Sequence, residues 1–100
     1  MNQLRLIAAI AERDVLRYTP AGIPIVSAKL QHSSEQVEAK VPRQVDMEIV
    51  AIAAGEISGR VNQAALGEMF LFKGFLARKN RNSKSLVFHV TDFESITPDH

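Results

Sequence analysis

Cysteine is absent from the 100-residue sequence, which excludes disulfide bonds, thiolate zinc sites and cysteine nucleophiles. A chain without cysteine fits a reducing compartment, so we expect a cytoplasmic protein. No apolar run approaches the roughly 18 residues that a membrane-spanning helix needs. The first residues also lack the positively charged start and the small-residue cleavage site of a secretory signal peptide. The sequence therefore gives no sign of export or membrane insertion.

Motifs that would indicate an enzyme are also missing. No glycine-rich loop ends in Gly-Lys-Ser or Gly-Lys-Thr, and Gly55-Glu56-Ile57-Ser58-Gly59 misses the spacing of a nucleophile elbow by one position. Asp46 and Glu48 share one face of an expected strand, where solvated side chains explain them better than paired catalytic carboxylates do. His32 and His89 have no second histidine at metal-ligand spacing. We therefore expect no enzyme, no metal site and no cofactor.

Charge is nearly balanced, with 12 Lys and Arg against 11 Asp and Glu, so the chain as a whole is not a general polyanion binder. The cations are unevenly distributed, however. Residues 69–91 include no carboxylate, and their cations are Lys73, Arg78, Lys79, Arg81 and Lys84. This segment is locally basic.

Short alternating apolar segments predict an all-β domain. Repeats and linker-like stretches are absent and 46% of the residues are hydrophobic, which favours a single domain over residues 1–100. We expect an ordered core over 3–96 and a frayed tail at 97–100. The expected strands cover residues 4–16, 25–32, 39–53, 69–77 and 86–93. A change of phase in residues 9–12 indicates a bulge in the first strand.

The connections carry turn and helix signals. Pro20 and Gly22 predict a tight turn in residues 19–24. Residues 33–38 are polar and loop-like, and Pro42 suggests that the third strand starts at a sheet edge.

A short helix is expected between Gly55 and Gly67, with two turns at most, ended by Gly67. Residues 78–84 form a polar, basic loop that closes a hairpin. Five strands with a short helical insert between the third and fourth predict the Greek-key barrel of the OB-fold. That fold binds oligonucleotides with its second and third strands and flanking loops.

The phenylalanines fall in the two most apolar strands, so we assign them to the barrel core, with at most one serving as a platform for a base. They are Phe70, Phe72, Phe75, Phe88 and Phe93. Phe70 and Phe72 share their parity with Gly74, whereas Phe75 does not. The strand therefore presents aromatic rings to both faces unless Gly74 marks a bulge.

A family signature appears in the first hairpin. Its residues Leu16-Arg17-Tyr18-Thr19-Pro20-Ala21-Gly22-Ile23-Pro24 resemble that hairpin in the primosomal replication protein N family, which is related to bacterial single-strand-binding proteins. Further positions along nearly the whole chain are similar to that family. They are His32-Ser33-Ser34, Arg43-Gln44-Val45, Gly74-Phe75-Leu76 and Leu86-Val87-Phe88-His89.

The resemblance implies a homodimeric barrel that binds single-stranded DNA and helps to restart replication. It also implies contacts with the primosomal helicase and with helicase-loading primosome proteins. Well-known members have an aromatic residue in the third strand, whereas residues 43–48 have none and include Asp46 and Glu48. The apolar segment 4–10 offers an edge for pairing with a second copy, as a dimer requires.

Binding single strands without sequence preference requires cations for phosphates and aromatic rings for bases. We predict that the basic loop contacts nucleic acid through Arg78, Lys79, Arg81 and Lys84. The alternative is a hairpin tip that only maintains solubility. A second functional hypothesis is a small adaptor barrel whose basic loop meets an acidic partner protein.

Residues outside the basic loop extend the predicted site. Arg17 and Tyr18 flank the first turn, and Tyr18 combines a ring that can stack with a hydroxyl that stays hydrated. Its alternative role is packing against the neighbouring prolines. Lys29 and Arg43, in the second and third expected strands, either enlarge the basic surface or are isolated surface charges.

Overall fold

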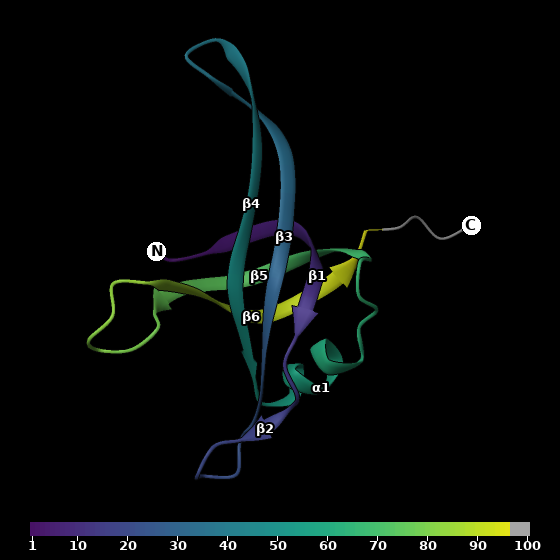
Figure 1. Ribbon diagram of the computed structural model, residues 1–100, viewed down its shortest axis with the longest axis vertical. Coiled ribbons are helices and arrows are strands. Elements are labelled where there is room, and N and C mark those ends of the chain that lie inside the picture. Colours follow the sequence, from purple (N-terminus) through teal and green to yellow (C-terminus); the bar gives the residue numbers. More distant parts are fainter. Residues whose placement is uncertain (97–100) are drawn as a thin grey trace.

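The alternating segments form strands, and the computed structural model, which describes residues 1–96, closes them into a barrel (Figure 1). In chain order the elements are β1 (Leu4–Arg13), β2 (Arg17–Tyr18), β3 (Pro24–Glu38), β4 (Val41–Ala54), α1 (Glu56–Gln63), β5 (Met69–Arg78) and β6 (Leu86–Ser95). The strand order is β1-β5-β6-β4-β3-β2, and an additional β1–β3 pairing closes the barrel. This confirms the predicted all-β OB-fold, to which the two-residue β2 is an addition. The expected frayed tail, 97–100, lies outside the described residues.

The first strand bends sharply and serves both sides of the barrel. Residues Leu4 to Ala9 pair with β5, and Ala9 to Arg13 pair with β3. The register shifts between Ile10 and Glu12, so the bulge predicted from the phase change is confirmed. The strand ends at Arg13, before the expected residue 16.

Strands β3 and β4 form a long hairpin that projects beyond the barrel (Figure 1). The expected loop at 33–38 is wrong, because these residues pair with β4 as far as Glu38 opposite Val41. Ala39 and Lys40 make the turn with φ of 52° and 66°, the positive values that a two-residue hairpin turn requires. Polar side chains suit this arm because most of it is exposed to water on both faces.

The helix has the expected place and length, but it ends earlier than predicted. Ala64 becomes extended, with φ −66° and ψ 142°, so Gly67 lies beyond the end of the helix. Arg13 explains this end, because its guanidinium Nη1 donates to the carbonyls of Val61 and Ala64 at 3.0 and 2.6 Å. The Val61 carbonyl also accepts the N–H of Ala64 at 3.3 Å, and Arg13 adds a partner at the end of the helix, where carbonyls otherwise lack one. No helix in the described part of the chain is long and apolar enough to cross a membrane.

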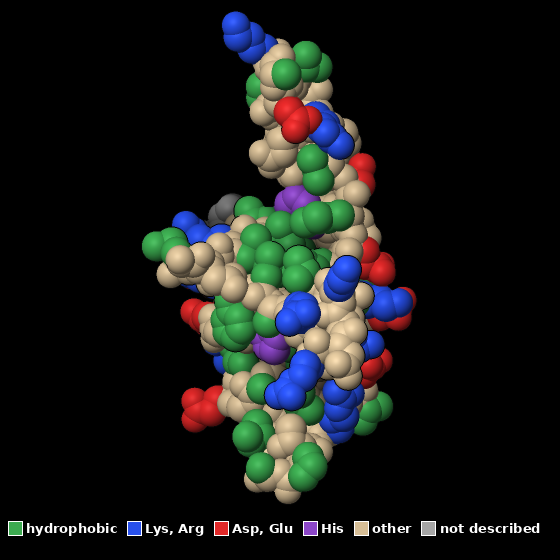
Figure 2. All heavy atoms as spheres, turned by 90° about the vertical axis from the view of Figure 1, so that its left-hand side faces the viewer, with side chains coloured by type: hydrophobic (Ala, Val, Ile, Leu, Met, Phe, Trp, Pro, Cys, Tyr) green, Lys and Arg blue, Asp and Glu red, His purple; other side chains and the backbone are tan. Residues whose placement is uncertain are grey.

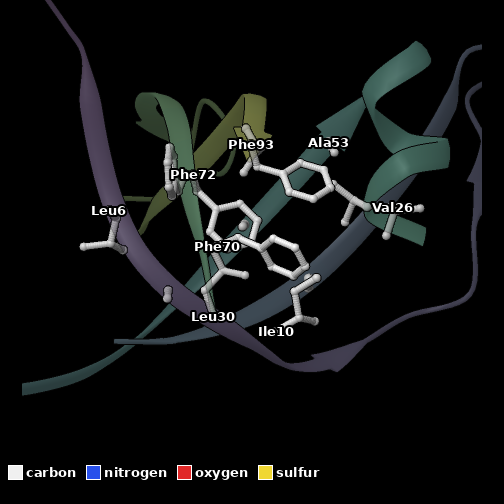
Figure 3. Close-up of a cluster of buried hydrophobic side chains, with 14 residues drawn as sticks. Leu6, Ile10, Val26, Leu30, Ala53, Phe70, Phe72 and Phe93 are labelled. Atoms are coloured by element: carbon white, nitrogen blue, oxygen red, sulfur yellow. The ribbon is translucent and has the colours of Figure 1, made fainter. Parts of the chain in front are cut away.

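Aromatic rings from β5 and β6 fill the middle of the barrel (Figure 3). The ring centroids of Phe70 and Phe93 lie 5.1 Å apart, and those of Phe72 and Phe93 lie 5.4 Å apart. Phe88 is also buried. The assignment of Phe75 to the core is wrong, because its side chain is 38% exposed on the outer face of β5. β5 therefore presents aromatic rings to both faces.

A bulge in β6 keeps Phe88 and Phe93, which differ in parity, on the same buried face. Lys73 lies opposite Asp92 but Gly74 lies opposite Val90, which leaves Thr91 as the extra residue. The two strands approach so closely here that a Cβ on Gly74 would overlap the backbone carbonyl of His89. Glycine is therefore required by packing at this position.

An arginine ties the helix to the end of β6. Arg60 donates to Asp92 Oδ1 at 3.0 Å and to the carbonyl of Phe93 at 2.7 Å, and its guanidinium lies 4.7 Å from the centroid of the Phe93 ring. The hydrogen bond from Arg60, helped by the backbone N–H of Phe93, holds the pKa of Asp92 below its ordinary value of 3.8. The contact fixes α1 across the end of the barrel.

Candidate nucleic-acid interface

A groove of about 210 Å³ lies on the outer face of the barrel where β3, β4 and β6 meet the two neighbouring loops. Its floor includes Val50 and Ile52 of β4 and His89 of β6. Arg17 of β2 and Lys79, the first residue after β5, also line it. No carboxylate is among its lining residues, so the described part of this groove carries only positive charge.

Two cations from distant parts of the sequence meet at this groove. Arg17 reaches it because β2 pairs with the start of β3, with Arg17 opposite Ile25. Lys79 reaches it because its N–H donates to the Ser85 carbonyl at 2.9 Å, which holds the base of the β5–β6 loop. On the side of the molecule that faces the viewer in Figure 2, basic side chains gather in the lower half close to a histidine. The groove therefore presents positive charge above an apolar floor.

The β5–β6 loop, residues 79–85, carries the other predicted cations at its exposed surface. Arg78 ends β5, and Arg81 and Lys84 lie within the loop, all exposed. The loop is ordered by its own hydrogen bonds, including Ser83 N–H to the Asn80 carbonyl at 3.2 Å. Among the described residues, no carboxylate lies within 4.0 Å of any of its cations. Their charge is available to a ligand.

Tyr18 follows Arg17 on β2 but is not among the residues that line the groove. It pairs with Pro24 across the first turn, and its side chain remains 68% exposed. The turn itself forms as predicted, with the Gly22 N–H donating to the Thr19 carbonyl at 2.8 Å and Gly22 at φ 84°.

Lys29 and Arg43 are not part of the groove. Lys29 lies opposite Val50 on the same outer face, but it is 4.0 Å from the carboxylate of Glu12. Arg43 lies far out on the β3–β4 hairpin and forms a 2.6 Å ion pair with Glu38. Both cations have an acidic partner, unlike those of the β5–β6 loop.

Sequence reasoning missed an aromatic pair on this surface, formed by Phe75 and His89, of which His89 lines the groove. The two residues are directly opposite on β5 and β6, and their rings stack with centroids 4.9 Å apart and planes inclined by 2°. The parity of Phe75, opposite to that of Phe70 and Phe72, was the available signal. It indicated an outward ring but gave no partner for it.

His32 has a structural role. His32 is buried, with Nδ1 at 2.6 Å from the Ile7 carbonyl and Nε2 at 2.7 Å from Ser34 Oγ. Within residues 1–96, no group of three His, Asp or Glu side chains comes together as a metal site would require.

The family described as "another single-strand binding protein family" matches residues 2–92. Replication restart protein PriB of Nitrosomonas europaea is 40% identical, over 91% of this chain and 84% of that protein. The PriB of Bordetella pertussis is 38% identical, over 90% of this chain and 84% of that protein. This chain belongs to the PriB family. The resemblance seen in the first hairpin is thereby confirmed.

Solved structures agree with this assignment. The PriB structure from Ralstonia solanacearum matches with a TM-score of 0.90 and 42% identity, covering 97% of this chain and 99% of that one. The single-stranded DNA binding protein from Thermus aquaticus matches with a TM-score of 0.75 and 22% identity, covering 97% of this chain and 50% of that one. The second likeness shows the shared OB-fold.

Proposed function

We propose that this protein is a single-stranded-DNA-binding accessory protein of replication restart. The observation that carries the proposal is the groove on the OB-fold face, which has an apolar floor, two cations and no carboxylate. The groove lies on strands β3 and β4, between the loop that follows β1 and the β5–β6 loop. OB-folds bind oligonucleotides at this place. The names of the PriB relatives support the link to replication restart.

Binding in this proposal is mainly electrostatic. Arg17, Lys79 and the exposed cations of the β5–β6 loop contact successive phosphates and release counterions. The bases then lie towards Val50 and Ile52, which offer apolar surface but no ring. We propose Tyr18 as a ring at the rim, and Lys29 as a weaker contact because of its pairing with Glu12. Arg43 contributes only if the strand extends along the β3–β4 hairpin.

The cellular part of the proposal follows from the family. A protein that restarts replication acts on chromosomal DNA in the cytoplasm, and we propose that it bridges single-stranded DNA to the primosomal helicase and to helicase-loading primosome proteins. The supporting observation is the membership of the PriB family.

Fluorescence anisotropy with a labelled thymidine oligomer of about 30 nucleotides tests the proposal. We expect binding that is tighter than to the same sequence as duplex. The plot of log affinity against log salt should have a slope of roughly −3, as about four phosphate contacts predict for single strands. Absence of binding at low salt would refute DNA binding and favour the adaptor hypothesis, in which the basic loop meets an acidic protein.

We also propose a homodimer, formed through the edge of β1 that faces away from β5. In residues 1–96 no strand pairs with the second edge of the segment 5–8, and Ile7 there is 41% exposed. An apolar strand with an open edge favours pairing with a second copy.

Light scattering at micromolar concentration is expected to give twice the chain mass of 11.1 kDa. Replacing Ile7 by lysine should lower the measured mass towards that of one chain, because a charge would be buried at the pairing edge. Wild-type protein that measures as a single chain would contradict the dimer.

A further inference from the structure

An aromatic pair on the outside of the barrel has no role in the fold that requires two rings. Phe75 is 38% exposed and His89 is half-buried, whereas the core beneath is already filled by Phe72, Phe88 and Phe93. The rings of Phe75 and His89 are almost parallel, at 4.9 Å and 2°. The two rings thus form a short stack on the outside of the barrel, and we call this stack the platform.

The platform has a defined orientation relative to the groove. Because the strand order is β5-β6-β4, His89 on β6 lies between Phe75 on β5 and Ile52 on β4. His89 lines the groove and Phe75 does not. Phe75 therefore supports the histidine ring from the side away from the groove, and the tight strand approach at Gly74 holds both residues in place.

The surroundings of this platform match a nucleotide. Lys79 and Arg17 line the same groove and are suited to the phosphates, and Ile52 continues the apolar floor beside His89. β4, which supplies the floor, has no aromatic residue over its whole length. His89 is thus the ring in the groove where a base can stack.

We propose that His89, backed by Phe75, is the platform on which a nucleobase of the bound single strand stacks. Histidine and phenylalanine both serve as stacking partners for unpaired bases. This inference rests on the proposed binding of single-stranded DNA and adds the residues that hold a base. It assigns base contact to His89 and phosphate contact to the cations, so the two can be measured separately.

The experiment compares a thymidine oligomer with an abasic oligomer of the same length, which keeps the phosphates and lacks the bases. His89→Leu should weaken binding of the thymidine oligomer by about tenfold, which is within the range reported for losing one stacked base. It should leave binding of the abasic oligomer unchanged. Phe75→Leu should have a smaller effect of the same kind, and Phe75→Tyr should restore wild-type affinity because it keeps the ring. Equal affinities of wild type and His89→Leu for the thymidine oligomer would overturn the proposal.

A fluorescent variant keeps the test decisive if His89→Leu does not fold. The chain has no tryptophan, so His89→Trp introduces a single reporter that preserves a stacking ring. Its emission should be quenched by the thymidine oligomer and not by the abasic one. Leu66→Trp, at an exposed position outside the groove and the β5–β6 loop, serves as the control and should respond little. Binding without selective quenching of His89→Trp would refute base stacking alone, whereas no binding by wild type would refute the proposed function and this inference together.

Discussion

Arg81→Ala combined with Lys84→Ala is expected to weaken binding of single-stranded DNA by about 25-fold near 0.1 M salt. Both side chains are exposed in the β5–β6 loop, and no carboxylate of the described residues lies within 4.0 Å of either. Each phosphate contact contributes about 0.7 to the slope of log affinity against log salt, so the double variant should have a slope shallower by about 1.4. Anisotropy titrations at several salt concentrations measure both quantities.

A matched control removes the same charge elsewhere. Lys40→Ala with Lys73→Ala deletes two cations, one at the turn of the β3–β4 hairpin and one on β5 that pairs with Glu94. Its affinity and its slope should remain close to those of wild type. Similar losses in both double variants would show that overall charge, and not the β5–β6 loop, governs binding.

Gly74→Ala is expected to destabilise the fold by about 3 kcal/mol, at the upper end of the usual cost of overpacking. The added methyl group would overlap the backbone carbonyl of His89, and a strand backbone cannot move aside as a flexible side chain can. A loss of this size corresponds to a fall in Tm of about 15 °C for a domain of this length. Thermal unfolding followed by circular dichroism measures the change.

Gly59→Ala is the control for this substitution. Gly59 lies inside α1, and outside the backbone of its own helix no atom comes within 4 Å of the position where a Cβ would stand. Alanine lowers the conformational entropy of the unfolded chain and favours a helix, so this variant should be more stable by about 0.5–1 kcal/mol. A Gly74→Ala protein that melts within about 2 °C of wild type would show that β5 and β6 separate at little cost.

Much of the fold could be predicted because local patterns carried the signal. Alternation placed the strands, the phase change at 9–12 located the bulge in β1, and Pro20 with Gly22 located the first turn. The polar residues 33–38 were misinterpreted because a hairpin exposed on both faces lacks the apolar face that marks most strands. The helix end was misplaced because Arg13, distant in sequence, terminates the helix, and glycine is only one of several ways to end it.

Some features of the candidate site could likewise be predicted from local sequence, and others depend on the fold. The number of cations and the polarity of a loop are local properties, so the basic character of the β5–β6 loop was evident from the sequence alone. Arg17 and Lys79 line the same groove because β2 and the β5–β6 loop lie next to each other in the fold. Only the topology of the chain decides this. Pairing of Lys29 with Glu12 also depends on tertiary contacts, and it separates this lysine from the unpaired cations of the loop.

The sequence by itself determined the strand-rich barrel and the location of its basic loop, because alternation, turn residues and charge runs act over a few neighbouring positions. Its family was indicated by the resemblance of residues 16–24 and further segments to known members. Only the tertiary structure decided which cations face a common groove and that Phe75 stacks on His89 outside the core. That stacking requires the register between β5 and β6, which is set by the extra residue Thr91 between Val90, opposite Gly74, and Asp92, opposite Lys73. Such pairing is a long-range property, because it depends on how two separate strands align and not on the residues within either one.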